Sequence, residues 1–228
     1  MPYEYKYPRP GLTTDTVAFT ILDDALSVAL IKRGIEPFLG KWALPGGYVR
    51  ENEAPAECAV REMSEETGYA IPFSYLSNFA IYGDAGRDPR GWIVSAAFYA
   101  LVPQNQSSKL TLKPDSDAAE AEWFRLDALP ELAFDHAQIV ADAYSRLRTD
   151  VFGEDRVSRA EEVFGFLPEE FTIAQLRSTF EAIKGQPIDK KNFRKWITEA
   201  FELVDTGRKE TGGRHRPAAL FISNGPSR

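Results

Sequence analysis

The sequence has 228 residues, of which 43% are hydrophobic, 12% aromatic and 27% charged, enough for one large or two small domains with a real core. No apolar run approaches the roughly 18 residues that a membrane helix needs, and the N-terminal MPYEYKYPRP lacks the basic-then-apolar layout of a secretory signal. Cys58 is the single cysteine, so an internal disulfide is impossible and a reducing compartment fits best. We therefore expect a cytoplasmic protein without membrane contact.

The net charge of −7 is unevenly distributed along the chain. Residues 1–165 hold 16 lysines and arginines against 26 acidic residues, whereas residues 166–228 hold 11 against 8. This asymmetry predicts that the acidic part and the basic tail meet different partners. Chance variation over a tail of this length is the alternative.

Patterns of apolar residues predict a strand-rich N-terminal part with two helices. The expected strands are 16–22, 26–33, 79–82, 92–101 and 122–126. The expected helices are 53–67, with Pro55 in its first turn and Gly68 as its stop, and 136–148. The polar stretch 149–159 predicts a linker. We therefore expect an α/β sandwich with a mixed sheet at 1–153 and a separate domain at 154–228.

The C-terminal part has the pattern of a winged helix-turn-helix domain. A capping box of Thr172 and Gln175 opens a helix at 171–183, and Asp189 opens a second, basic helix at 190–201. A strand at 202–205, the loop TGRKETGGR and a returning strand at 215–222 would form the wing. A generic helical dimerisation domain is the alternative. The residues expected to contact DNA are Lys190, Lys191, Asn192, Arg194, Lys195, Arg208, Arg214 and Arg216.

One motif carries chemistry. The segment GYVRENEAPAECAVREMSEETGY fits Gly-x5-Glu-x7-Arg-Glu-U-x-Glu-Glu-x-Gly-U, where U is apolar, with only Tyr69 bulkier than usual at its position. Seven fixed positions would match by chance on the order of 10⁻⁸ times per start. This is the Nudix box, and the chain here resembles Nudix hydrolases. The matches are Gly47, Glu53, Arg61, Glu62, Met63, Glu65, Glu66, Gly68 and Tyr69.

The spacing within the box predicts a metal site. Glu62, Glu65 and Glu66 stand at i, i+3 and i+4, so three carboxylates share one helix face, which favours a neutralising cation. Oxygen ligands favour Mg²⁺ or Mn²⁺ over zinc, and Gly47 lets the backbone approach the metal. The resemblance implies that Glu53, Arg61 and Glu65 serve catalysis, with Arg61 paired to Glu53. A solvated acidic helix and a decayed site that binds without cleaving are the alternatives.

Residues outside the box carry weaker signals. Arg33, Arg87 and Arg90 are candidate phosphate or ribose contacts, because arginine pairs bidentately with phosphate, although surface salt bridges are as plausible. Trp42 is expected to pack in the core rather than stack on a base, and His136 to be a hydrogen-bonded structural histidine.

Over nearly its full length the chain resembles the NrtR family, Nudix-related transcriptional regulators of NAD metabolism. The resemblance rests on YPRPGLTTD, KWALPGGYV, RDPRGW, LAFDH, FTIAQLR, IDKKNFRKW and RHRPAALF. It implies a Nudix domain that senses ADP-ribose or a related nucleotide and a winged helix that binds operator DNA as a homodimer to repress NAD genes. Some relatives have a degenerate box, but this box is complete, so pyrophosphatase activity stays open. A Nudix hydrolase with a dimerising tail and a sugar-sensing regulator are the alternatives.

Overall fold

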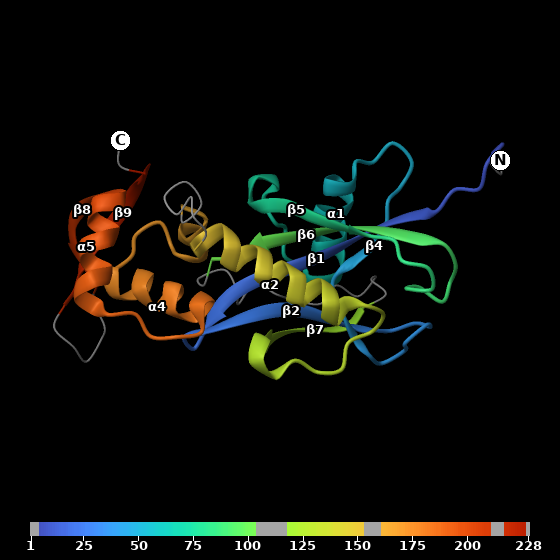
Figure 1. Ribbon diagram of the computed structural model, residues 1–228, viewed down its shortest axis with the longest axis horizontal. Coiled ribbons are helices and arrows are strands. Elements are labelled where there is room, and N and C mark those ends of the chain that lie inside the picture. Colours follow the sequence, from blue (N-terminus) through green and yellow to red (C-terminus); the bar gives the residue numbers. More distant parts are fainter. Residues whose placement is uncertain (1–4, 104–117, 153–160, 211–216, 227–228) are drawn as a thin grey trace. The chain divides into compact units, whose positions relative to one another are not determined.

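The computed structural model describes residues 5–103, 118–152, 161–210 and 217–226. The chain divides into two compact units (Figure 1). Unit 1 comprises residues 1–19, 28–100 and 109–143, and unit 2 comprises residues 20–27, 101–108 and 144–228. None of the described helices is long and apolar enough to cross a membrane.

A seven-stranded sheet forms the framework of the N-terminal part. Its main path runs β3-β2-β1-β6-β5, while β4 pairs with β1 and β7 pairs with β2. The strands are β1 (Gly11–Leu22), β2 (Ala25–Arg33), β3 (Trp42–Ala43), β4 (Gly46–Tyr48), β5 (Leu76–Tyr82), β6 (Ile93–Leu101) and β7 (Ala118–Arg125).

All five predicted strands are present with shifted ends, and the two short strands β3 and β4 were not predicted. β1 begins at Gly11, five residues before its predicted start, because Thr13 and Thr14 pair with β4 and are buried despite their polar side chains. The two-residue turn before β2 holds Asp23 and Asp24 at positive φ, 48° and 57°, as expected for a tight hairpin.

Two helices cover opposite faces of this sheet. They are α1 (Pro55–Thr67) and α2 (His136–Phe152), and α2 crosses in front of the strands in Figure 1. On β6, Ala96 packs in one cluster with Ala59 of α1. The preceding Ser95 points to the other face, where it donates a 2.6 Å hydrogen bond to Asp15, the partner of His136 at the start of α2. The expected sandwich of a sheet between helices is therefore observed.

The helix boundaries correct two predictions. α1 begins at Pro55 rather than residue 53, so Glu53 lies in the turn before the helix, and Gly68 ends it at φ 75° as predicted. α2 continues to Phe152, so the first four residues of the predicted linker are helical. Val151 extends the buried face of α2, and the buried Asp150 accepts a 2.7 Å hydrogen bond from Arg146 one turn earlier. Residues 153–159 of that linker lie outside the described residues.

Unit 2 contains the predicted pair of helices and the hairpin. They are α4 (Ile173–Lys184), α5 (Lys190–Ala200), β8 (Phe201–Lys209) and β9 (Ala219–Pro226). Three short 3-10 turns complete the described elements of the chain, η1 (Phe73–Tyr75), η3 (Leu126–Ala128) and η4 (Glu161–Phe166). The predicted capping box opens α4, because Thr172 Oγ1 accepts from the N–H of Gln175 at 3.1 Å and Gln175 accepts from the N–H of Thr172 at 2.7 Å.

The hairpin differs from its prediction. β8 continues through the first four residues of the predicted loop to Lys209, and β9 starts at Ala219 instead of residue 215. The polar Thr206–Lys209 segment joins the strand because ladder pairing does not require apolar side chains, and Gly207 supplies the φ of 72° at an irregularity in the pairing. The pattern of alternating apolar residues therefore predicted too short a strand, because the outer half of β8 is exposed.

Candidate functional site

Two glycines bring the sheet against the Nudix helix. Gly46 and Gly47 lie on β4, where they pair with Asp15 and Thr14 of β1. A Cβ atom on Gly46 would collide with the carbonyl oxygen of Thr14, and one on Gly47 would collide with the carboxylate of Glu62. The absence of a side chain at Gly47 therefore lets a carboxylate of the box lie against the backbone of β4.

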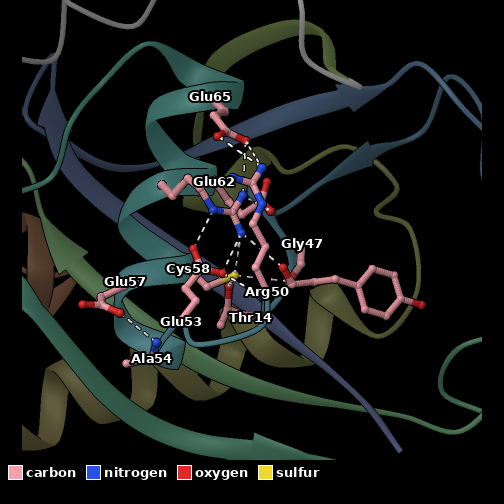
Figure 2. A network of polar contacts seen from close by, with 11 residues as sticks. Thr14, Gly47, Arg50, Glu53, Ala54, Glu57, Cys58, Glu62 and Glu65 are labelled. Carbon is pink, nitrogen blue, oxygen red and sulfur yellow. Dashed lines mark hydrogen bonds and ion pairs between the residues drawn. The ribbon is translucent and has the colours of Figure 1, made fainter. Parts of the chain in front are cut away.

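Arg61 is the centre of the site. Its guanidinium donates to both carboxylate oxygens of Glu53, at 2.6 and 2.9 Å, and to Glu62 at 2.6 Å and Glu65 at 3.2 Å. Figure 2 shows Glu53, Glu62 and Glu65 together with Arg50 in this network of polar contacts. It also donates to the carbonyl of Tyr48 at 3.2 Å. The hydrogen bond from Arg61, opposed by partial burial, lowers the pKa of Glu53 to about 2. The expected Arg61–Glu53 pair thus joins the turn before α1 to the helix itself.

The three carboxylates of the predicted metal face point in different directions. Glu62 is 15% exposed, and burial raises its pKa despite the contact with Arg61. Glu65 is 44% exposed and lies between Arg61 and Arg50. Glu66 is buried and accepts a 2.9 Å hydrogen bond from the backbone N–H of Gly46.

Arginines therefore contact two of the three carboxylates, Glu62 and Glu65. No group of three or more histidine, cysteine, aspartate or glutamate side chains among the described residues lies close enough to hold a metal ion. The donor chemistry nonetheless fits a divalent ion, because Glu62 and Glu65 offer carboxylate oxygens and the carboxylate of Glu62 lies beside the backbone of Gly47. Arg50 was missed by the sequence reasoning, since it holds no fixed position in the motif.

A small cavity beside β4 gathers the three predicted arginines. Its walls include Arg33, Arg87 and Arg90 together with Phe134 and His136. The guanidinium groups of Arg33 and Arg90 lie over the Phe134 ring, at 5.0 and 5.3 Å from its centre. Arg33, the pair Arg87 and Arg90, and Phe134 come from three distant parts of the sequence, so their meeting is a product of the tertiary structure.

The three arginines differ in their freedom to bind a ligand. Arg87 is 6% exposed and donates two 2.7 Å hydrogen bonds to Asp135. Arg90 is 35% exposed and pairs with the buried carboxylate of Asp88 at 2.7 Å. Arg33 donates to the carbonyl of Pro37 at 2.7 Å. Of the two arginines that pair with aspartates, Arg90 is the more accessible to a ligand. Arg87 is nearly buried and mainly holds Asp135 in place.

Phe134 is a second residue that the sequence reasoning missed. It holds a φ of 51°, a conformation that costs a non-glycine residue about 1–3 kcal/mol. Phe38 packs against it edge-on at 4.7 Å, and the ring of His136 lies 5.2 Å away. Only an observed backbone angle could have singled out this ring, because LAFDH carries no local signal for positive φ.

His136 and Trp42 take the structural places expected of them. His136 is buried, accepts a 2.8 Å hydrogen bond at Nδ1 from the N–H of Leu44 and lies 3.3 Å from Asp15 through Nε2. Burial would raise the pKa of Asp15, but His136, Ser95 and Arg87 lower it on balance. Trp42 packs edge-on against Phe124 at 4.6 Å. Cys58 is buried, and burial raises the pKa of its thiol to about 11.

The second candidate site is the basic helix α5. Asp189 caps it by accepting a 2.8 Å hydrogen bond from the N–H of Asn192, while Phe193 and Ile197 turn into the core. The exposed side of the first two turns of α5 carries four cations that form no ion pair with any described residue, namely Lys190, Lys191, Arg194 and Lys195.

Of the three arginines predicted on the wing, the described residues include only one. Arg208 lies on β8 and pairs with Glu170. Arg214 and Arg216 lie outside the described residues. Within the described part of unit 2, unpaired positive charge is therefore concentrated on α5.

Comparison with known proteins covers both units. A family model described as "NUDIX domain" matches residues 12–143, and one described as "NrtR DNA-binding winged helix domain" matches residues 163–222. The chain is 32% identical over 219 residues to the ADPR responsive transcriptional repressor NtrR of Acinetobacter baylyi, covering 94% of this chain and 82% of the relative.

Two solved structures extend the comparison. Shewanella oneidensis NrtR complexed with a 27mer DNA matches with a TM-score of 0.75 and 32% identity, covering 93% of each chain. The NUDIX domain of the same protein complexed with ADP ribose matches with a TM-score of 0.54 and 32% identity, over 64% of this chain and 94% of that one. These matches confirm the predicted fold class, a Nudix α/β sandwich with a mixed sheet followed by a winged helix-turn-helix domain.

Proposed function

This chain belongs to the NrtR family of Nudix-related regulators, and we propose that it is a transcriptional repressor of NAD biosynthesis or salvage genes. In this proposal residues 154–228 bind operator DNA and residues 1–153 sense ADP-ribose or a related nucleotide. The matched ranges 12–143 and 163–222 support this division. The protein would act as a homodimer in the cytoplasm, where its operator lies.

The observation that carries the DNA-binding part is the charge on α5. Lys190, Lys191, Arg194 and Lys195 are exposed and form no ion pair with a described residue, in a chain whose net charge is −7. Unpaired cations on the second helix of a helix-turn-helix suit the phosphates and base edges of a major groove. Asn192, Arg208, Arg214 and Arg216 are the further contacts we assign to DNA. The S. oneidensis relative with DNA supports the same use of this domain.

We assign the nucleotide to the cavity lined by Arg33, Arg87 and Arg90. Phe134 offers a ring face, and Arg90 offers a partly exposed guanidinium suited to a phosphate or ribose. The relative complexed with ADP ribose supports this choice of ligand. Arg87 would act mainly by holding Asp135 and Asp15 in place.

Retained pyrophosphatase activity is a second candidate function, because the box is complete and Arg61 is paired with Glu53. Nudix hydrolases generally use divalent cations. We propose Mg²⁺ or Mn²⁺ here, held by Glu62, Glu65, Glu66 and the backbone of Gly47. When bound, the ion would neutralise the diphosphate and activate the attacking water. Arg61 would keep Glu53 ionised and anchored, while Glu65, the most exposed carboxylate, could accept a proton.

A mobility-shift assay tests the regulatory proposal. DNA from upstream of the chain's own gene and its neighbours is titrated with protein, with and without ADP-ribose and with metal withheld. Specific binding that ADP-ribose weakens is the expected result. Absence of specific binding to any of these fragments contradicts the repressor, and metal-dependent release of AMP would then favour the hydrolase.

A further inference from the structure

Unit 2 contains a cavity that the proposed function does not use. Its volume is about 720 Å³, and its walls come from the last turns of α2, from α4 and from α5. Cavities of about 300–1,000 Å³ are typical of sites for small organic molecules. The cavity is therefore large enough for a ligand of two fused or linked rings.

Aromatic side chains form much of the wall. The ring centres of Phe180, Phe193 and Trp196 lie 5.4 to 5.8 Å apart, and Phe152 lies 6.1 Å from Phe180. Phe180 and Phe193 are buried, so their positions are fixed by packing, whereas Trp196 is half-buried and faces the cavity. Such a surface favours a flat aromatic ligand, which can stack on or meet these rings edge-on.

The charge of the lining points to the sign of the ligand. Two of its twelve described residues, Arg148 and Lys184, are cationic and none is acidic. Neither cation forms an ion pair with a described residue, and Arg148 lies over the Tyr144 ring at 5.6 Å from its centre. Cations without carboxylate partners beside an apolar wall complement an anion that also carries an apolar body.

We propose that this cavity binds a small organic anion with an aromatic ring. The ring would lie against Phe180 and Trp196, and the carboxylate, sulfonate or phosphate would meet Arg148 and Lys184. Asn192, Phe193 and Trp196 belong to α5, so an occupant would contact the helix that carries the proposed DNA-binding cations.

The probe is 8-anilinonaphthalene-1-sulfonate, compared with uncharged N-phenyl-1-naphthylamine, which shares its rings. Fluorescence titration of the full chain is expected to show one sulfonate probe bound per chain. The Arg148→Gln/Lys184→Gln double variant should bind the sulfonate about tenfold more weakly, equivalent to about 1.4 kcal/mol, and the uncharged probe unchanged. Ser145→Trp, placed on the lining to fill the cavity, should weaken both probes.

A matched control removes the same two charges elsewhere. Lys41→Gln/Arg125→Gln takes away one lysine and one arginine that do not line the cavity and should leave both affinities unchanged within twofold. The proposal is overturned if the wild type and the Arg148→Gln/Lys184→Gln variant bind the sulfonate probe with equal affinity. It is also overturned if binding of the probe falls as the protein concentration rises, because a second copy would then cover the cavity. Circular dichroism checks that each variant is folded. If Ser145→Trp misfolds, the comparison of the wild type with Arg148→Gln/Lys184→Gln tests the proposal by itself. Neither DNA nor ADP-ribose enters this experiment, so its failure leaves the proposed function untouched.

Discussion

The Arg61–Glu53 pair should make the N-terminal unit depend on pH in a defined window. Glu53 has a pKa of about 2 in the folded chain against an ordinary 4.5, because Arg61 donates two hydrogen bonds to it. A carboxylate with a lowered folded pKa stabilises above its unfolded pKa, and that stability is lost as pH falls through the folded value. The contribution of Glu53 should therefore be complete at pH 7 and decline from about pH 5 to about pH 2.

The shift limits the size of this contribution. The difference of about 2.5 between the two pKa values corresponds to roughly 3.4 kcal/mol at most, and solvent screening at this partly buried pair reduces that to about 1–2 kcal/mol. Glu53→Gln keeps the shape and removes the charge, so it should cost about this much at pH 7. For a contribution of this size, linkage predicts that more than half of the difference disappears by pH 3.5, where the unfolded chain is already protonated.

Urea unfolding of a Trp196→Phe background measures this. The remaining tryptophans, Trp42, Trp92 and Trp123, all lie in unit 1, so their fluorescence reports that unit alone. Arg125→Gln, which removes an exposed ion pair with Asp127, serves as a control and should leave the stability nearly unchanged at either pH, because surface ion pairs contribute little. An equal cost of Glu53→Gln at pH 7 and pH 3.5 would refute the assignment of the stability to this ionised pair.

Three further predictions concern function. Lys191→Ala and Arg194→Ala should each weaken operator binding and lower its salt slope by about one, measured by fluorescence anisotropy at several salt concentrations; an unchanged slope moves the DNA surface elsewhere. Glu62→Gln should abolish metal-dependent release of AMP from ADP-ribose while circular dichroism stays native, and residual metal-dependent turnover would remove Glu62 from the metal site. Arg90→Ala should blunt the effect of ADP-ribose on DNA affinity without changing that affinity itself, and an intact ADP-ribose response in this variant places the ligand elsewhere. Arg87→Ala should instead lower the melting temperature, because it leaves the carboxylate of Asp135 unpaired.

The extent of α2 bears on how ligand binding and DNA binding could be coupled. The polar stretch 149–159 was predicted to be a linker, where a rotation could couple the two sites, but its first four residues belong to α2. This helix begins at His136, which lines the cavity proposed for the nucleotide, and ends at Phe152, which lines the second cavity. Coupling still requires that ADP-ribose bind the DNA-bound and DNA-free forms with different affinity. A continuous helix is therefore an additional element on which that difference could act.

The sequence by itself determined the parts of this protein whose signals are local. The Nudix box lies within one helix and its preceding turn, and the family resemblance that it carries implied the Arg61–Glu53 pair, which is observed. The capping box at Thr172 and the cap at Asp189 are likewise confined to a few residues, and both are observed. Local rules suffice where a structure is stabilised by neighbours along the chain.

Only the tertiary structure decided which distant residues meet. Arg50 contacts Glu65 of α1 across 15 positions, because the segment before the helix packs against it. Phe134 and Arg90 share a cavity although 44 positions separate them, and no spacing rule connects two such loops. Polar residues of β8 became a strand by pairing with β9 rather than by their own pattern. Contacts of this kind depend on chain packing, which composition and periodicity along the sequence do not encode locally.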